Sequence, residues 1–246
     1  MTLRLDDLQN GYHLWQDPEG FCFGIDAVLL AHYTQLRKHD RVLDMGCGNG
    51  IIPVLLTRYA PEDVHVTGLE IQDGAFALAQ KNVVHNKLED RITIRQGDLK
   101  TAGTTFGDGA FHVVTCNPPY WKKGSGYVSD GSALAIARHE ILCDLEDVIT
   151  SAAKVLKSKG RFFMIHSPER IPEMIRHMAK CHLEMKTMRL IHPYADKAPT
   201  MVLIGAVKGG NPGLKVEKPL VVYEPDGTYT PEVLAIYGKD GQNEKN

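Results

Sequence analysis

The sequence lacks the features that mark membrane, secreted and zinc-binding proteins. No apolar run approaches the ~20 residues that a membrane-spanning helix needs. The opening stretch MTLRLDD carries acidic side chains where a signal peptide has its apolar core. The five cysteines are odd in number and form no C-x-x-C pair, and the histidines lack the spacing of metal ligands. We therefore expect a reduced, cytoplasmic protein with no membrane span and no metal site.

Net charge is also scarce, which by itself does not favour a nucleic-acid partner: the formal total is −2. The charges are unevenly distributed, however, with −5 over residues 1–117, +6 over 118–220 and −3 over 221–246. The basic middle segment could face phosphate groups, or it could be an ordinary solvated surface. Charge alone leaves both interpretations open.

What the chain does have is a regular alternation of strands and helices, and its 246 residues suit one α/β domain. The predicted strands cover residues 41–45, 64–70, 91–98, 111–116, 160–166, 182–192 and 200–208. The predicted helices cover 26–36, 51–59, 73–86 (with Asp73 as its N-cap), 145–156 and 168–180. This order predicts a mostly parallel seven-stranded sheet, with an antiparallel C-terminal strand pair because no helix separates the last two strands.

The breaker cluster GGNPG separates this core, residues 37–208, from a C-terminal appendage at 209–246. The appendage is predicted to hold a strand, a turn and a short helix. Residues 1–36 precede the core within the same domain.

A glycine-rich loop, DMGCGNG at 44–50, follows the first predicted strand and precedes a helix. Gly46, Gly48 and Gly50 would let the backbone approach a ligand and leave N–H groups at the helix start. Glu70 ends the next strand, 24 residues after Gly46, where a carboxylate can take ribose hydroxyls. A structural tight turn is the alternative for such a loop taken alone.

Two features of the loop disfavour a dinucleotide-binding dehydrogenase. The fingerprint G-x-G-x-x-G requires a small sixth residue, and Ile51 occupies that position. Asp44, just before the loop, would repel a pyrophosphate but would favour a cationic amino-acid group. The loop therefore fits a ligand with an amine, a sulfonium and a ribose, such as S-adenosylmethionine.

Together these residues resemble the class I S-adenosylmethionine-dependent methyltransferases, over most of residues 20–208, and this resemblance implies their Rossmann-like fold. It also implies that Asp98 meets the adenine amino group of the cofactor and that Ile71 packs on the adenine ring. Leu99, the residue after Asp98, is expected in the same cofactor site. The alternatives are a loop cap for Asp98 and a core position for Ile71.

The segment FGIDAVLL, residues 23–30, resembles a segment that covers the cofactor from the N-terminal side in related enzymes. The resemblance makes residues 1–36 a cover segment and adds Gly24 and Asp26 to the cofactor site. A plain helix N-cap is the alternative for Asp26.

In the stretch VVTCNPPYWKKG, the apolar run of a predicted buried strand ends at Asn117, Pro118, Pro119 and Tyr120. In the family that it resembles, this motif marks enzymes that methylate a planar nitrogen. The Asn117 side-chain oxygen and the Pro118 carbonyl would accept the two amine hydrogens and aim the nitrogen lone pair, with Asn117 also touching the cofactor. Tandem prolines hold that carbonyl rigidly, and Tyr120 would stack on the target base. A rigid turn that ends a strand is the alternative.

Among families with this motif, the chain most resembles the bacterial tRNA1(Val) adenine-37 N6-methyltransferases. This resemblance implies an RNA partner, tRNA near the anticodon, with Tyr120, Trp121, Lys122, Lys123 and Arg138 as substrate contacts. A surface connection with incidental charges is the alternative for the segment that follows the motif.

Other acceptors stay open: a protein glutamine, a ribosomal guanine N2 group, or no reaction at all in an RNA-binding module that has lost catalysis. The sequence does not determine the oligomeric state, and we favour a monomer.

Overall fold

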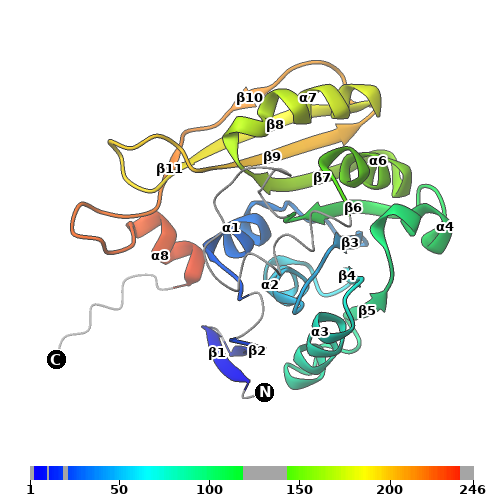
Figure 1. The fold of residues 1–246 in the computed structure, drawn as a ribbon, viewed down its shortest axis with the longest axis horizontal. Helices are drawn as coiled ribbons and strands as arrows, with labels where there is room; N and C mark the ends of the chain where they lie inside the picture. Colours follow the sequence, from blue (N-terminus) through cyan, green and yellow to red (C-terminus); the bar gives the residue numbers. More distant parts are fainter. Residues whose placement is uncertain (1–2, 10, 19–21, 119–142, 239–246) are drawn as a thin grey trace.

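The computed structural model describes residues 3–9, 11–18, 22–118 and 143–238 (Figure 1). Its main sheet has nine strands in the order β10-β8-β9-β7-β6-β3-β4-β5, with β11 also paired to β8. The parallel strands are β3 (Arg41–Met45), β4 (His65–Glu70), β5 (Ile92–Gln96), β6 (Phe111–Cys116) and β7 (Leu156–His166). The predicted α/β architecture is thus confirmed.

The antiparallel C-terminal pair is confirmed as well, and its arrangement determines which loops share an edge of the sheet. Strand β9 (Met201–Lys208) lies between β7 and β8 (Leu183–His192) and is antiparallel to both. Consequently β8 runs in the same direction as β3 to β7. Two short strands extend the sheet parallel to β8. Strand β10 (Lys215–Val216) was not predicted, whereas β11 (Leu220–Val221) is the strand expected in the C-terminal appendage.

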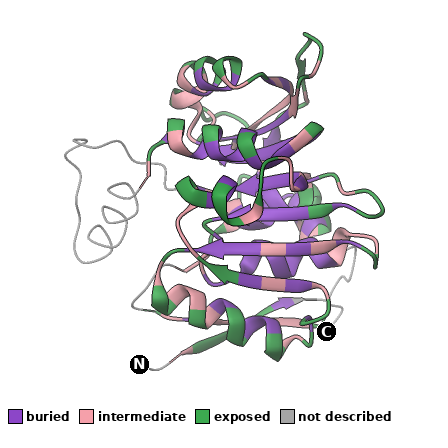
Figure 2. Cartoon of the chain, turned by 90° about the vertical axis from the view of Figure 1, so that its right-hand side faces the viewer, coloured by how far each residue is buried: buried purple, intermediate pink, exposed green. Residues whose placement is uncertain are grey.

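Helices cover both faces of the sheet (Figures 1 and 2), and alternate strand residues belong to two separate apolar cores. One core includes residues of α1 (Ile25–Tyr33), α2 (Ile51–Tyr59), α3 (Asp73–His85) and α8 (Pro231–Tyr237). The other includes residues of α4 (Ala102–Phe106), α6 (Leu145–Val155) and α7 (Ile171–Lys180). Two 3₁₀ turns, η1 (Leu99–Thr101) and η2 (Pro168–Arg170), precede α4 and α7.

Alternation within the strands explains the two cores: Val42 and Val113 belong to the first, and their neighbours Leu43 and Val114 to the second. Parallel strands that are buried on both faces need such continuous apolar runs. No helix among the described residues is long and apolar enough to cross a membrane.

Several predicted boundaries were wrong for local reasons. Helix α1 ends three residues early, because Thr34 is extended and bonds Leu30 through both its N–H and its hydroxyl. Gln72, not Asp73, is the N-cap of α3, and the Asp73 carboxylate instead accepts a hydrogen bond from the Gln96 side chain. Strand β7 starts four residues before the predicted position, and Lys159 has a positive φ of 62° there.

The N-terminal part contains a hairpin for which no strands were predicted. Strands β1 (Arg4–Gln9) and β2 (Tyr12–Gln16) form a separate antiparallel sheet. Two asparagines one turn apart on α3 hold β2 by its backbone: Asn82 bonds the N–H and C=O of Trp15, and Asn86 bonds those of His13. These amide groups act on the edge of β2 as a neighbouring strand would.

Candidate active site

The carboxyl ends of the parallel strands bring the predicted site residues to one edge of the sheet. Asp44 lies in β3 just before the glycine loop, Glu70 ends β4, and Asn117 directly follows β6. Asp98 follows β5 after Gly97, whose N–H donates to the Glu70 carbonyl at 2.9 Å. Open α/β sheets bind their ligands at this edge.

Gly46 and Gly48 give the loop its shape and leave open space beside it. Their φ angles are 71° and 54°, which favour glycine, and a Cβ on either would meet no atom within 4 Å. Gly50 also has a positive φ, of 85°, but a Cβ there would lie 3.3 Å from the Ala79 Cβ of α3. Gly50 therefore faces a helix, and the free space beside the loop lies at the first two glycines.

Asp44 is fully buried, and one of its carboxylate oxygens lacks a partner. Its Oδ1 accepts a hydrogen bond from the Thr115 hydroxyl at 2.6 Å, whereas Oδ2 has no partner among the described residues. Burial raises the Asp44 pKa to about 7; the Thr115 hydrogen bond opposes this rise and the Glu70 charge adds to it. A buried, unsatisfied acceptor is costly, so the site is suited to a cationic donor.

Thr115 was not among the predicted site residues. The available signal was a lone hydroxyl in the apolar run FHVVTC. Its side chain lies beside Asp44 because β6 and β3 are neighbours and pair Thr115 with Asp44 in register.

Glu70 joins the glycine loop to the end of β4. It is 1% exposed, its Oε2 accepts from the Gly48 N–H at 2.8 Å, and its Oε1 accepts from the Gln72 N–H at 2.9 Å. Each carboxylate oxygen has a second lone pair that can accept from a ribose hydroxyl. The next residue, Ile71, is 37% exposed, which excludes the core alternative for this residue.

Asp98 adopts the loop-cap conformation that the sequence left as an alternative. Its carboxylate accepts from the Lys100 N–H at 2.9 Å and so caps η1, with the Lys100 Nζ at 3.8 Å. The Leu99 side chain packs against the second core. A role of Asp98 toward adenine stays a prediction, and the cap holds its carboxylate at the strand edge.

Asp26 does not have the N-cap role but directly contacts the NPPY motif. Gly24 is the N-cap of α1, and the Asp26 Oδ2 accepts a hydrogen bond from the Asn117 Nδ2 at 3.0 Å. Its Oδ1 accepts from the Ala27 N–H at 2.9 Å. A Cβ at Gly24 would lie only 2.8 Å from that Oδ1, so glycine allows Asp26 to take this position.

This contact orients the Asn117 amide. A carboxylate only accepts hydrogen bonds, so it selects the NH₂ end of the amide, and the amide oxygen points to the other side. The next residue, Pro118, is buried. Pro119, Tyr120, Trp121, Lys122, Lys123 and Arg138, the remaining predicted site residues, lie outside the described residues.

Comparison with known proteins identifies the family. A family model described as a methyltransferase domain matches residues 36–202. The chain belongs to this methyltransferase family. The expected enzyme class is therefore confirmed.

Curated relatives of this methyltransferase carry the name that the resemblance anticipated. The proteins of Tolumonas auensis and Shewanella woodyi are 25% and 26% identical to it. The matches cover 92% of this chain in both cases, and 92% and 94% of the relatives. Both relatives are named tRNA1(Val) (adenine(37)-N6)-methyltransferase.

Solved structures confirm the Rossmann-like methyltransferase fold. A predicted O-methyltransferase from Agrobacterium tumefaciens has a TM-score of 0.71 at 23% identity, covering 88% of this chain and 97% of that chain. Geranyl diphosphate C-methyltransferase from Streptomyces coelicolor, with S-adenosyl-L-homocysteine, has a TM-score of 0.55 at 19% identity and covers 75% of each chain. Among the residues described for the present enzyme, no three His, Cys, Asp or Glu side chains cluster as a metal site would require.

Proposed function

We propose that this methyltransferase transfers the methyl group of S-adenosylmethionine to the exocyclic N6 amino group of an adenine in tRNA, beside the anticodon. The observation that carries the proposal is the Asp26–Asn117 hydrogen bond at the end of β6. It orients a hydrogen-bond acceptor at the strand edge that also holds the glycine loop. The names of the curated relatives support the choice of substrate.

The residues at the loop fit the cofactor. The unpartnered Oδ2 of Asp44 can accept from its ammonium group, the open sides of Gly46 and Gly48 leave room for it, and Glu70 can accept from its ribose. When bound, S-adenosylmethionine supplies a methyl group activated by a sulfonium. The chain itself binds and orients the two reactants.

Asn117 and Pro118 supply the chemistry that the acceptor needs. An adenine amino group is a poor nucleophile because its lone pair is delocalised into the ring. Two carbonyl oxygens that accept its hydrogens would favour a pyramidal nitrogen. Its lone pair would then take the methyl group that the cofactor supplies, the N–C bond forming as the methyl–sulfur bond breaks and the thioether S-adenosylhomocysteine leaves. The nitrogen becomes acidic in that step and loses its proton afterwards. Positioning, not a general base, therefore accounts for the rate.

The substrate contacts that we propose are Tyr120, Trp121, Lys122, Lys123 and Arg138. Aromatic side chains can stack on an unpaired base, and the cations can neutralise phosphates. A tRNA substrate also supports the expected cytoplasmic location.

The proposal is tested with tritiated S-adenosylmethionine and bulk tRNA from a strain that lacks this enzyme, followed by nucleoside analysis. We expect labelled N6-methyladenosine. A labelled guanosine derivative, or labelled protein from a matched extract, would retain methyl transfer but overturn the substrate.

The Asn117→Ala variant tests the mechanism in the same assay. Loss of one positioned acceptor should lower the single-turnover rate by ~10²–10³ and change cofactor affinity little. Asn211→Ala, in an exposed loop, is the matched control. An Asn117→Ala enzyme within threefold of wild type would refute the proposed role of this residue.

A further inference from the structure

Four tyrosines near the C-terminal end of the chain form a continuous stack. Tyr194 lies in the loop between β8 and β9, Tyr223 and Tyr229 pair across a turn, and Tyr237 ends α8. Successive ring centroids are 5.6, 5.4 and 5.5 Å apart, with interplanar angles of 36°, 15° and 13°. The last two pairs have the small angles of offset-stacked rings, and the Tyr194 ring is tilted against Tyr223. The stack therefore forms one aromatic row.

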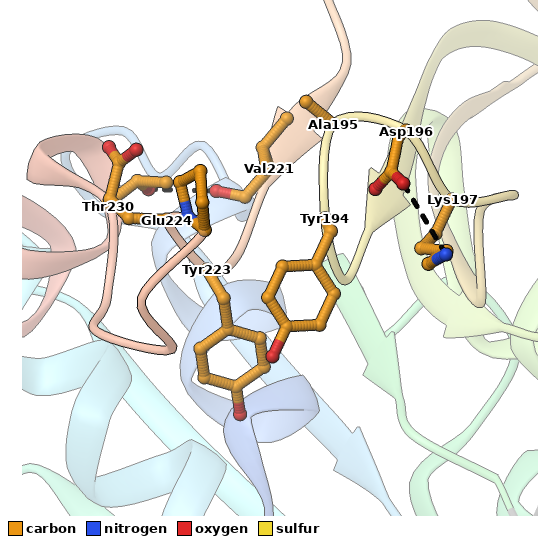
Figure 3. Close-up of a pocket in the computed structure, with 9 residues that line it drawn as sticks. Tyr194, Ala195, Asp196, Lys197, Val221, Tyr223, Glu224 and Thr230 are labelled. Carbon is orange, nitrogen blue, oxygen red and sulfur yellow. Dashed lines mark hydrogen bonds and ion pairs between the residues drawn. The ribbon is translucent and has the colours of Figure 1, made fainter.

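A hollow of about 730 Å³ opens beside Tyr194 and Tyr223, a volume within the range of small-molecule sites. Figure 3 shows these two rings side by side, with Asp196 and Lys197 on the far side of the β8–β9 loop. Glu224 also lines the hollow. The Lys197 Nζ lies 3.4 Å from the Asp196 carboxylate, and both side chains are well exposed.

The hollow lies at the same edge of the sheet as Asn117. Because β8 runs parallel to β6, its end at His192 faces the same way as the end of β6, and Tyr194 follows two residues later. Two strands, β9 and β7, lie between β8 and β6, so the lateral offset is about 14 Å at the usual strand spacing. The register also places Cys116 level with Met188, so β8 extends four residues, about 13 Å, beyond the end of β6. An unpaired stretch of a few nucleotides can cover such a distance.

The inner end of the row lies on α8, a helix that contacts the helix bearing Asp26. Helix α8 packs against α1, which carries Asp26 (Figure 1). Burial raises the pKa of Tyr237, and the charges of Tyr229 and Asp26 add to the rise, so the Tyr237 hydroxyl lies within the field of the carboxylate that holds Asn117. The aromatic row thus runs from the hollow to the helix that packs on α1.

We propose that this hollow is a second nucleobase subsite, which holds an unpaired base of the RNA a few nucleotides from the methylated adenine. The Tyr194 end of the row is partly exposed and lines the hollow, so it offers a ring on which a base can stack. Asp196 and Glu224 can accept hydrogen bonds from base amino groups, and Lys197 can donate to a base carbonyl. The carboxylates of Asp196 and Glu224 outnumber the ammonium of Lys197, so the hollow would repel an isolated phosphate. A nucleobase, which is uncharged, fits this lining better. This inference rests on the proposed RNA substrate.

The test is a thermodynamic cycle with anticodon stem–loops whose unpaired bases are replaced, one at a time, by abasic nucleotides. Tyr194→Ala removes a ring in a loop rather than a core side chain, and Tyr194→Phe retains the stacking surface. We expect Tyr194→Ala to weaken stem–loop binding by ~5- to 100-fold, as stacking on one base would. Tyr194→Phe should bind like wild type, and cofactor affinity should not change.

One abasic position should weaken the wild-type complex but not that of Tyr194→Ala, because the missing base and the missing ring are partners. Leu214→Ala, which removes an exposed apolar side chain elsewhere, is the control. If every abasic effect is additive with Tyr194→Ala, or if this variant binds like wild type, the subsite is refuted while the tRNA activity stands. If the wild type methylates no RNA, the proposed function fails, and this inference with it.

Discussion

At the scale of single residues, the carboxylate of Asp26 determines which end of the Asn117 amide faces the acceptor. The two side chains come from α1 and from the end of β6, and one hydrogen bond of 3.0 Å joins them. In the proposed mechanism Asp26 acts through Asn117 and is thus a positioning residue. Its effect should appear in the rate of transfer rather than in the affinity for either reactant.

Asp26→Asn tests this role with almost no change in side-chain volume. An amide at this position can donate as well as accept, so it no longer selects one orientation of Asn117. We expect kcat to fall about 10- to 100-fold, the value of a hydrogen bond to an ionised group. The KM for tRNA and the Kd for S-adenosylhomocysteine should change little. Asp108→Asn, on an exposed loop before β6, is the control, and a loss confined to cofactor affinity would contradict the positioning role.

Asp44 makes a second residue-scale prediction, about pH. Its pKa is raised to about 7 without cofactor, mainly by burial, and a cationic amine binds better to the ionised form. The affinity for S-adenosylhomocysteine should therefore increase as the pH rises through about 7. Calorimetry across this range should show a flatter profile and weaker binding for Asp44→Asn. Because the ligand amine titrates in both enzymes, the difference between the profiles isolates Asp44.

The same raised pKa makes the free energy of unfolding of the cofactor-free protein decrease as the pH rises, whereas the affinity for the cofactor increases. The folded, cofactor-free protein holds the Asp44 proton more tightly than the unfolded chain, whose value is near 3.8. This contribution to stability is complete below about pH 4 and is lost as the pH rises toward 7. Cofactor binding should therefore stabilise the fold more at pH 8 than at pH 6, which thermal unfolding can measure.

At the scale of elements, α3 substitutes for a missing neighbour of β2. Asn82 is fully buried and makes three hydrogen bonds: two with the Trp15 backbone and one, at 2.9 Å, with the Asn49 carbonyl in the glycine loop. One side chain thus ties the N-terminal hairpin to the loop that we assign to the cofactor. Helix propensity alone would not favour asparagine here, so the tertiary contacts account for it.

Asn82→Ala should lower the free energy of unfolding by about 3 kcal/mol, because three backbone groups, two on the partly buried Trp15 and one on the buried Asn49, lose their partner. Hydrogen exchange at the Trp15 N–H should accelerate, while exchange at Val114 in β6 should follow the global stability only. Gln80→Ala, on the exposed face of the same helix, is the control. Unchanged exchange at Trp15 would mean that the asparagine does not hold the hairpin.

At the scale of the whole molecule, the distribution of charge along the chain matters more for RNA binding than the net charge. The net charge is −2, yet residues 118–220 carry +6. The proposed RNA contacts Lys122 and Lys123 follow the motif that ends β6. Arg37 and Lys38 precede β3 and therefore belong to the opposite, amino edge of the sheet.

The double variant Lys122→Ala with Lys123→Ala should weaken tRNA binding and lower the salt slope by about two, one for each phosphate that a lysine no longer neutralises. Arg37→Ala with Lys38→Ala removes the same charge from the amino edge and should leave the slope unchanged. Filter binding over a salt series measures both. Equal slopes in the two double variants would exclude the segment after β6 as an RNA-binding segment.

The sequence by itself determined the elements whose signals are local. β3, α2 and β6 have the predicted bounds, because Gly46 follows β3, Gly50 precedes α2 and Asn117 follows β6. It also placed Asp44, Glu70 and Asn117 at strand ends, since a carboxyl edge follows from strand direction alone. The enzyme class followed from the resemblance of these combined motifs to a known methyltransferase family.

Only the tertiary structure decided which distant groups became partners. Asp26 and Asn117 are 91 residues apart, and Trp15 and Asn82 are 67 apart. The tyrosine row likewise depends on β9 lying between β7 and β8, which places the β8–β9 loop at the catalytic edge. Periodicity and turn residues report the local conformation of the backbone. Contacts across a sheet depend on strand order, which the packing of the whole chain selects.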